Sequence, residues 1–236
     1  MIRLTPRLKM LAELVTPGTT IADIGTDHAY LPAWLIQNGI CPSAWACDVQ
    51  NGPLENARET VLEENLEHAI DLRLGSGLRP LLQDVPQGIV MAGMGGLLMI
   101  ELLEDRIELA RTVDYLLLQP MTSQPELRRW LVENGFGIVQ ERLAQENWRY
   151  YEIIRAEYGN PQSPNSLNDE IGYVLPKSDD PLFQAFIGNQ IRIYEKIVKE
   201  ASRSESGSER SAQCRERLEQ LQEVYRCALI HEKSSS

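Results

Sequence analysis

The sequence predicts an α/β fold with a mostly parallel, seven-stranded sheet, followed by a helical hairpin at the C-terminus. Three observations predict it. Short apolar strands alternate with helical segments between residues 19 and 134. Two β-rich runs then follow with no helix between them, and two apolar stripes at helical spacing close the chain. Strands that alternate with helices are typical of a parallel sheet with right-handed crossovers.

Each element has its own local signal. Apolar side chains at helical spacing predict a first helix over residues 4–15, which Thr16-Pro17-Gly18 ends. The expected parallel strands span residues 19–25, 43–49, 70–76, 88–94 and 114–119. The helices expected between and after them span residues 30–38, 56–65, 97–103 and 126–134, with a short turn over 78–82.

The last two β-rich runs, residues 136–145 and 149–157, are separated only by Glu146-Asn147-Trp148. We expect a hairpin that closes the sheet with one antiparallel strand. Five β-α units followed by a hairpin are the order of the class I methyltransferase fold, which is Rossmann-like. A plain dinucleotide-binding domain ends in a further parallel strand instead. We expect this domain to span residues 1–158.

Residues 159–236 predict a linker and a C-terminal antiparallel coiled-coil domain. Residues 158–178 are rich in Pro, Asn, Ser and Gly, so we expect little regular structure there. Two narrow apolar stripes follow, separated by a polar break at residues 202–208, and they predict a protruding helical hairpin. The stripes contain Leu182, Phe183, Phe186, Ile187, Gln190, Ile193, Tyr194 and Ile197, then Cys214, Leu218, Leu221, Tyr225 and Ala228.

Composition narrows the setting in which the protein works. The four cysteines show no C-x-x-C spacing, which argues against a zinc site or a disulfide scaffold and favours a reduced, cytoplasmic compartment. No stretch approaches the roughly 20 apolar residues of a membrane span. We therefore expect no metal and no membrane partner.

The net charge of −11 is a mild argument against a nucleic-acid partner. A local basic patch can still lie on an acidic body. Arg3, Arg7 and Lys9 crowd the N-terminus, and Arg128-Arg129 form a second cluster. Scattered, solvated side chains are an equally good reading of both groups.

Polar or glycine residues follow four of the predicted strands, at the edge where open α/β sheets bind their ligands. Asp48 comes at the end of the second strand, where a carboxylate can accept hydrogen bonds from both ribose hydroxyls. A turn or helix-capping role is the alternative. The four strand ends read Asp23-Ile24-Gly25-Thr26-Asp27-His28, Cys47-Asp48-Val49, Gly75-Ser76-Gly77-Leu78 and Ala92-Gly93-Met94-Gly95-Gly96.

The first of these turns lacks the glycines of a phosphate-binding loop. Pyrophosphate needs close approach to several backbone N–H groups, and Asp27 would repel it. An adenosine without phosphates fits better. S-adenosyl-L-methionine suits the turn, because its ammonium and sulfonium cations would be attracted by Asp23 and Asp27.

Three motifs together, ADIGTDHAYLP, AGMGG and LLLQPM…LRRWL…NG, resemble the bacterial tRNA (adenine-22-N1)-methyltransferases over residues 1 to about 157. The resemblance implies S-adenosyl-L-methionine as methyl donor, a tRNA as partner, and methylation of N1 of an adenine in the D-arm region. It also implies the class I fold and a C-terminal coiled coil. Family members usually carry Glu in place of Asp48, and Asp or Asn near Ser76.

On this basis the expected donor-binding residues lie at all four strand ends. We expect His28 to shape the pocket by hydrogen bonding. Asp27 and Tyr30 are the expected catalytic residues: a carboxylate that stabilises the charge left on the methylated base, and a ring that stacks on an extruded base. The alternatives are a helix cap for Asp27 and core packing for Tyr30. The expected donor-binding set is Asp23, Gly25, Asp27, His28, Asp48, Val49, Ser76, Gly77, Leu78, Ala92, Gly93 and Met94.

The fourth strand end also bears on the acceptor. Methyltransferases that act on an exocyclic adenine amine typically carry Asn/Asp-Pro-Pro-aromatic there, whereas this chain has Gly93-Met94-Gly95-Gly96. A ring nitrogen therefore fits better. Gln119-Pro120 either lines the substrate side or simply terminates the fifth strand.

Two other functions stay open at this stage: a methyltransferase for a protein or small molecule, and a donor-binding scaffold protein. If RNA is the partner, we expect Arg3, Arg7, Lys9 and the helical arm to contact its phosphates. A monomer or a weak homodimer is expected.

Overall fold

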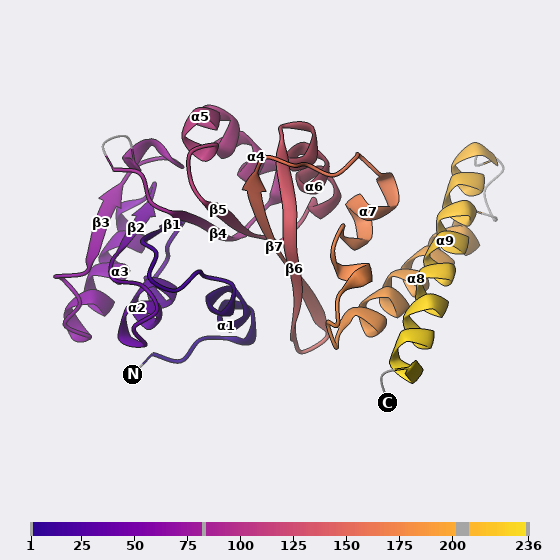
Figure 1. The fold of residues 1–236 in the computed structure, drawn as a ribbon, viewed down its shortest axis with the longest axis horizontal. Helices are drawn as coiled ribbons and strands as arrows, with labels where there is room; N and C mark the ends of the chain where they lie inside the picture. Colours follow the sequence, from indigo (N-terminus) through magenta and orange to yellow (C-terminus); the bar gives the residue numbers. More distant parts are fainter. Residues whose placement is uncertain (1, 82–83, 202–207, 235–236) are drawn as a thin grey trace.

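A computed structural model describes residues 2–81, 84–201 and 208–234 (Figure 1). Its strands are β1 (Ile21–Ile24), β2 (Ala44–Asp48), β3 (Ile70–Leu74), β4 (Gly88–Met94), β5 (Tyr115–Pro120), β6 (Phe136–Glu146) and β7 (Arg149–Tyr158). Its helices are α1 (Pro6–Glu13), α2 (Tyr30–Gln37), α3 (Asn51–Glu63), α4 (Gly96–Asp105), α5 (Ile107–Ala110), α6 (Gln124–Glu133), α7 (Ser166–Ile171), α8 (Phe183–Ala201) and α9 (Ser208–Ser234), with 3₁₀ turns η1 (Arg79–Leu81) and η2 (Leu175–Lys177).

The seven strands form one sheet in the order β3-β2-β1-β4-β5-β7-β6. Strands β1 to β5 pair in parallel, and β7 lies antiparallel between β5 and β6. The strand order therefore reverses between β1 and β4, which places a ligand-binding crevice at their carboxyl ends. This topology confirms the class I methyltransferase fold expected from the sequence.

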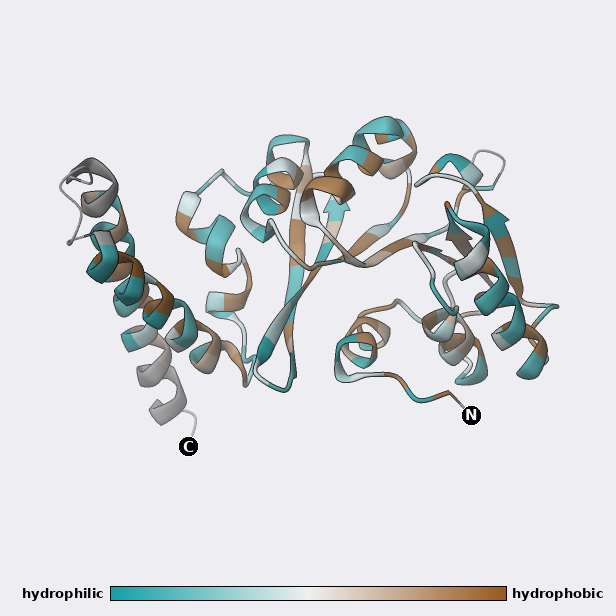
Figure 2. Cartoon of the chain, turned by 180° about the vertical axis from the view of Figure 1, so that it is seen from behind, coloured by the Kyte–Doolittle hydropathy of each residue, from teal (hydrophilic) through white to brown (hydrophobic). Residues whose placement is uncertain are grey.

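Alternating side chains divide each central strand between two hydrophobic cores, because successive residues of a strand point to opposite faces. Ala22, Met91 and Leu118 pack with α4 and α6, whereas Ile21 and Val90 pack with α1 and α2. Figure 1 shows α1, α2 and α3 on one face of the sheet and α4, α5 and α6 on the other. The central strands are largely hydrophobic and the helices turn polar residues outward (Figure 2).

Two helices differ from the sequence-based expectation. Helix α3 begins at Asn51, five residues before the predicted start, because Pro53 falls in the first turn, where its missing N–H costs no helical hydrogen bond. The four-residue helix α5 was not predicted. Its only local signal is one turn of apolar residues, too short for periodicity to detect.

The expectation of little regular structure over residues 158–178 is wrong. Asn165 caps α7 by accepting from the N–H groups of Leu167 and Asn168, which is a local signal that the Pro- and Ser-rich composition hides. Ile171 and Leu175 are buried against α8, and Gln162 pairs with the backbone of Ile138. The segment packs on the sheet instead of looping freely.

Arg128 and Arg129 do not form a surface basic patch, because both are paired with carboxylates and only Arg129 is exposed. Arg128 is fully buried and pairs with Glu141 and Glu152, at 2.7 Å in each case. Arg129 pairs with buried Asp169 at 2.8 Å. Both arginines therefore fasten α6 to the hairpin and to α7.

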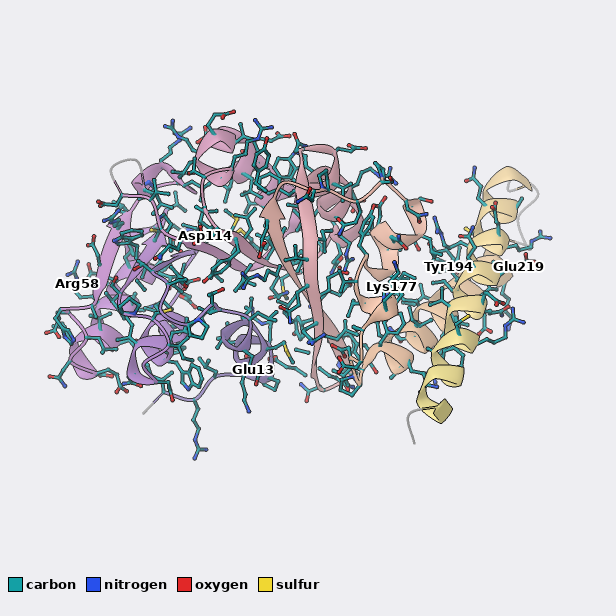
Figure 3. All side chains as sticks on the ribbon, viewed as in Figure 1. Glu13, Arg58, Asp114, Lys177, Tyr194 and Glu219 are labelled. Atoms are coloured by element: carbon teal, nitrogen blue, oxygen red, sulfur yellow. The ribbon has the colours of Figure 1, made fainter. Side chains whose placement is uncertain are left out.

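Helices α8 and α9 form the expected antiparallel hairpin, which projects from the side of the molecule furthest from β3 (Figure 1). Phe186, Ile187 and Leu221 form its buried centre. Ile193, placed in the apolar stripe by its spacing, is instead 45% exposed. Tyr194 (labelled in Figure 3) donates its hydroxyl to Glu170 at 3.0 Å, which joins the arm to α7. Residues 202–207 of the predicted polar break lie outside the described residues.

Candidate active site

A cleft with a volume of about 420 Å³ opens at the carboxyl ends of β1 and β4, where the strand order reverses. Every residue from Gly25 to Leu31 lines it, together with Asp23 below and Ala92 and Gly93 of β4. Thr5, Arg7 and Leu8, at the start of α1, form the remaining wall. The described cleft is therefore built from three segments that are far apart in the sequence.

The first two amide groups of the turn after β1 hydrogen-bond to the neighbouring strand. The N–H groups of Gly25 and Thr26 both donate to the Cys47 carbonyl oxygen, at 2.8 and 3.0 Å. Gly25 has a φ of +79°, and a Cβ there would lie 2.9 Å from the Met94 methyl group. Because these two N–H groups are occupied, they are not available to a phosphate as the N–H groups of a dinucleotide loop are. The structure thus supports an adenosine ligand without phosphates.

Asp23 is a buried carboxyl at the floor of the cleft, 8% exposed. Burial raises its pKa to about 6, Asp48 adds to the rise, and the nearby Thr26 hydroxyl and Arg7 guanidinium partly offset it. The Thr26 hydroxyl oxygen is itself buried and, apart from Asp23, has no hydrogen-bond partner among the described residues. A carboxyl and a hydroxyl left in this state fit a cationic, hydrogen-bonding ligand.

Tyr30 and His28 form an exposed aromatic pair on the cleft wall. Their rings stack with centroids 4.9 Å apart and an interplanar angle of 7°. Tyr30 is 43% exposed, so core packing is not its role. The stack explains what His28 contributes to the pocket: it supports the Tyr30 ring, in addition to its contact with Asp27.

Asp27 projects from the same turn into solvent. Its Oδ2 lies 3.5 Å from Nε2 of His28, and its side chain is 72% exposed. Ala29, not Asp27, occupies the N-cap position of α2, with a φ of +52° and no side-chain cap. The capping role considered for Asp27 is therefore absent, and its carboxylate is accessible from the cleft.

Gln119 connects α1 to the sheet beneath the cleft. Its buried Oε1 accepts from Arg7 Nη1 at 2.7 Å and from the Gly93 N–H at 3.2 Å, while its Nε2 donates to the Pro120 carbonyl at 3.0 Å. Arg7 is therefore part of the cleft wall, not a free surface cation. Residues 7 and 119 are too far apart in sequence for any local pattern to reveal this contact.

Comparison with known proteins is consistent with this geometry. The sequence profile of the family described as "Methyltransferase domain" matches residues 4–154. The tRNA (adenine(22)-N(1))-methyltransferase of Bacillus subtilis (strain 168) is 29% identical over 232 residues, which are 94% of this chain and 97% of that protein.

Solved structures agree. The crystal structure of Streptococcus pneumoniae Sp1610, described as a putative tRNA (m1A22) methyltransferase, is 31% identical, with a TM-score of 0.88 over 94% of this chain and 100% of that one. The chain belongs to the tRNA (adenine-22-N1)-methyltransferase family. The S. pneumoniae protein has also been solved with S-adenosyl-L-methionine, at 30% identity and a TM-score of 0.81 over 95% of this chain and 100% of that one.

The buried Asp23 carboxyl at the floor of the described cleft suits a cationic ligand of that kind. Seven of the predicted site residues line the cleft directly: Asp23, Gly25, Asp27, His28, Tyr30, Ala92 and Gly93. Met94 lies against Gly25 from the next strand. The structure therefore brings the residues of the first and fourth strand ends together.

The remaining predicted residues lie at the ends of β2 and β3, along the same edge of the sheet. Asp48 Oδ1 accepts from the Gln50 N–H at 2.8 Å, so the carboxylate also holds its own turn. Val49 is 62% exposed beside it. The Leu78 side chain is buried in the core, and Ser76 is exposed. Gly77, with a φ of +53°, packs against Leu102, where a Cβ would come within 2.8 Å.

Among the described residues, neither a metal site nor a membrane-spanning helix is found. No three His, Cys, Asp or Glu side chains converge as a metal site would require. None of the described helices is long and apolar enough to cross a membrane.

Proposed function

We propose that this protein transfers a methyl group from S-adenosyl-L-methionine to N1 of adenine 22 in tRNA. The cleft at the switch point of the sheet carries the proposal, because a buried carboxyl and an exposed aromatic pair meet there within a class I fold. The family supplies the acceptor, since its relatives act on this tRNA position according to their names.

Each of the four strand ends is proposed to contact a different part of S-adenosyl-L-methionine. Asp23 and the Thr26 hydroxyl face the methionine end, where the ligand carries its ammonium group. Asp48 accepts from the ribose hydroxyls, and exposed Val49 offers an apolar surface to the adenine. Ser76 and the Leu78 backbone contact the edge of that adenine, while Gly25, Ala92 and Gly93 allow close approach.

On the acceptor side, the exposed pair of Tyr30 and His28 receives the extruded base. Tyr30 stacks on the adenine, with His28 supporting its other face. When bound, the donor supplies an electrophilic methyl group, and the chain's main task is to hold N1 in line with it. Asp27 is placed to stabilise the positive charge left on the base, or to accept a proton from the exocyclic amine.

Arg3 precedes α1 and Lys9 lies within it; both side chains are exposed, and they are proposed to contact RNA phosphates. Arg7 keeps one guanidinium N–H on Gln119, so any phosphate contact uses its remaining donors. A cytoplasmic setting and a monomeric or weakly dimeric state stay predictions.

The test is methyl transfer from labelled donor to an unmodified tRNA transcript. We expect incorporation into the A22 transcript, with an arrest of reverse transcription at position 22, and none into a matched transcript that carries G22. Incorporation that is equal in both transcripts would contradict the assigned position. Donor binding without any transfer to tRNA would contradict the function.

A further inference from the structure

Trp148 is the most exposed large hydrophobic side chain described, with 85% of its surface accessible. It stands at the turn between β6 and β7, next to Asn147, whose φ of +55° makes the turn tight. An indole ring gains free energy when it is buried, and its flat face stacks readily on another ring. The ring is not packed in the hydrophobic core, and it does not line the described cleft.

The turn lies at the same edge of the sheet as the cleft. Strand β6 runs in the same direction as β5, because both are antiparallel to β7, so its end projects beyond the carboxyl ends of the parallel strands. The Arg7 N–H donates to Glu146 Oε1 at 3.0 Å, which joins the last residue of β6 to the cleft wall. Figure 1 shows this turn beside α1.

The base of the turn is held firmly. Arg149 Nη2 donates to the Met121 carbonyl at 2.8 Å, and the Arg149 guanidinium lies 5.2 Å from the ring centre of Tyr151. The Arg7 guanidinium lies 5.8 Å from the same ring. Trp148 therefore projects from a fixed platform that is continuous with the cleft, instead of from a loose loop.

Arginines without an ion pair also gather near the β6–β7 turn. Most arginines with described side chains pair with a carboxylate, including Arg58, Arg73, Arg79, Arg106, Arg111, Arg128, Arg129, Arg142, Arg155, Arg217 and Arg226. Among the described residues, the guanidinium groups of Arg3, Arg7, Arg149 and Arg192 form no ion pair with a carboxylate, although the backbone N–H of Arg7 donates to Glu146. All but Arg192 lie in the N-terminal segment or beside the hairpin turn. On a chain of net charge −11, this concentration of unpaired cations is local.

We propose that Trp148 stacks on an unpaired nucleobase of the substrate RNA, next to the adenine that enters the cleft, while Arg149 contacts the adjoining phosphate. The inference rests on the proposed function. An exposed aromatic ring beside unpaired cations is the arrangement by which proteins hold single-stranded nucleotides. Extrusion of one base also unstacks its neighbours, which then need a new stacking partner.

A second copy of this chain fits the turn less well. One tryptophan covers about 150–250 Å², far below the roughly 1,200 Å² of a stable interface. A symmetric contact at the turn would also bring unpaired arginines of the two copies together. RNA phosphates, in contrast, complement them.

The experiment compares the wild-type protein with Trp148→Ala and Trp148→Phe in steady-state methylation of the tRNA transcript, with donor affinity measured separately. We expect Trp148→Ala to raise KM for tRNA about tenfold with kcat and donor affinity unchanged, because only base stacking is lost. Trp148→Phe restores most of the loss. Val139→Ala, an exposed residue near the other end of the hairpin, is the matched control and leaves KM unchanged.

Fluorescence gives an independent readout. Trp34, Trp45 and Trp130 are at least partly buried, so quenching of Trp148 on adding tRNA should be visible in the wild type and absent from Trp148→Ala. If the wild type methylates tRNA and Trp148→Ala leaves KM for tRNA unchanged, the role of Trp148 is overturned and the proposed function stands. A wild-type dimer that Trp148→Ala dissociates, at unchanged KM, also overturns it, in favour of a protein contact. A wild type that never methylates tRNA overturns the proposed function as well.

Discussion

The buried Asp23 carboxylate lowers the stability of the folded protein, and it is proposed to bind the donor. Its carboxyl titrates near pH 6 in the folded protein because burial disfavours the charge. An unfolded Asp titrates at about 3.9, so the folded form binds more protons between those values. The free energy of unfolding therefore falls as the pH rises from about 4 to about 6, and the cost persists at neutral pH.

Replacing that carboxyl separates the two effects. We expect Asp23→Asn to raise the free energy of unfolding at pH 8 by up to about 3 kcal/mol, because a shift of about two pKa units is removed. Urea unfolding at pH 8 and pH 4 measures it, and the gain should vanish at the lower pH. The same variant should weaken donor binding about tenfold or more in calorimetry, because the cationic ligand loses its counter-charge. Unchanged donor affinity would contradict the placement of Asp23 at the ammonium group.

Tyr30 and Asp27 are separable by the kinetic constant that each controls. We expect Tyr30→Phe to keep most activity and Tyr30→Ala to lower kcat/KM about 10- to 100-fold, because stacking needs the ring and not the hydroxyl.

Asp27→Asn should lower kcat at least tenfold while donor affinity changes little, since the carboxylate acts on charge that develops during transfer. Full turnover by Asp27→Ala would show that this carboxylate has no catalytic role.

At the scale of elements, contacts between distant segments hold the site together. Gln119 fixes α1 against β4, and the buried pairs of Arg128 fix α6 against the hairpin. Glu141 also accepts from the Val174 N–H at 2.7 Å, and Arg128 donates to the Asp169 carbonyl at 3.1 Å. Through these bonds the segment between the sheet and the helical arm is part of the packed structure.

Breaking the Arg128 network should be costly. Arg128→Met leaves Glu141 and Glu152 buried without a cation, so we expect the free energy of unfolding to fall by about 3–5 kcal/mol at pH 7.5. Denaturant unfolding measures this loss. The triple replacement Arg128→Met, Glu141→Gln, Glu152→Leu should recover much of it, because no charge remains buried and the amide oxygen at position 141 can still accept from the Val174 N–H. Arg58→Met, which removes an exposed pair with Glu55, is the control and should change stability by less than about 1 kcal/mol.

At the scale of the whole molecule, an acidic body must approach an anionic substrate. The unpaired arginines beside the cleft offer a small, local target in a chain of net charge −11. Salt screens both the long-range repulsion by the acidic body and the attraction at these arginines.

This arrangement predicts a modest salt dependence of tRNA binding. We expect Arg3→Ala with Lys9→Ala to weaken binding and to lower the slope of log K against log salt by about 1 to 2, because about two phosphate contacts are removed. Binding titrations at several potassium chloride concentrations measure the slope. Glu55→Gln with Glu59→Gln on the outer side of α3 is the control, which should leave the slope unchanged. If Arg3→Ala with Lys9→Ala left the slope of log K against log salt unchanged, these two side chains would not contact RNA phosphates.

The strand ends could be predicted because local patterns encode them. Glycine, aspartate and β-branched residues punctuate each β-α unit, and the missing glycines after β1 already pointed to a donor without phosphates. The Arg7–Gln119 and Arg128–Glu141 contacts could not be predicted, since they join residues 112 and 13 positions apart through burial and not through periodicity. Whether Tyr30 lay in the core or on the surface also depended on packing.

The sequence by itself determined the order of strands and helices, the chemistry at their carboxyl ends and the family, because each follows from residue type and spacing along the chain. Only the tertiary structure decided which of those residues share one cleft, that α1 forms its wall, and that the β6–β7 turn carries an exposed tryptophan to its rim. The physical reason is that burial, charge pairing and pKa arise between segments distant in sequence, and only folding brings them into contact.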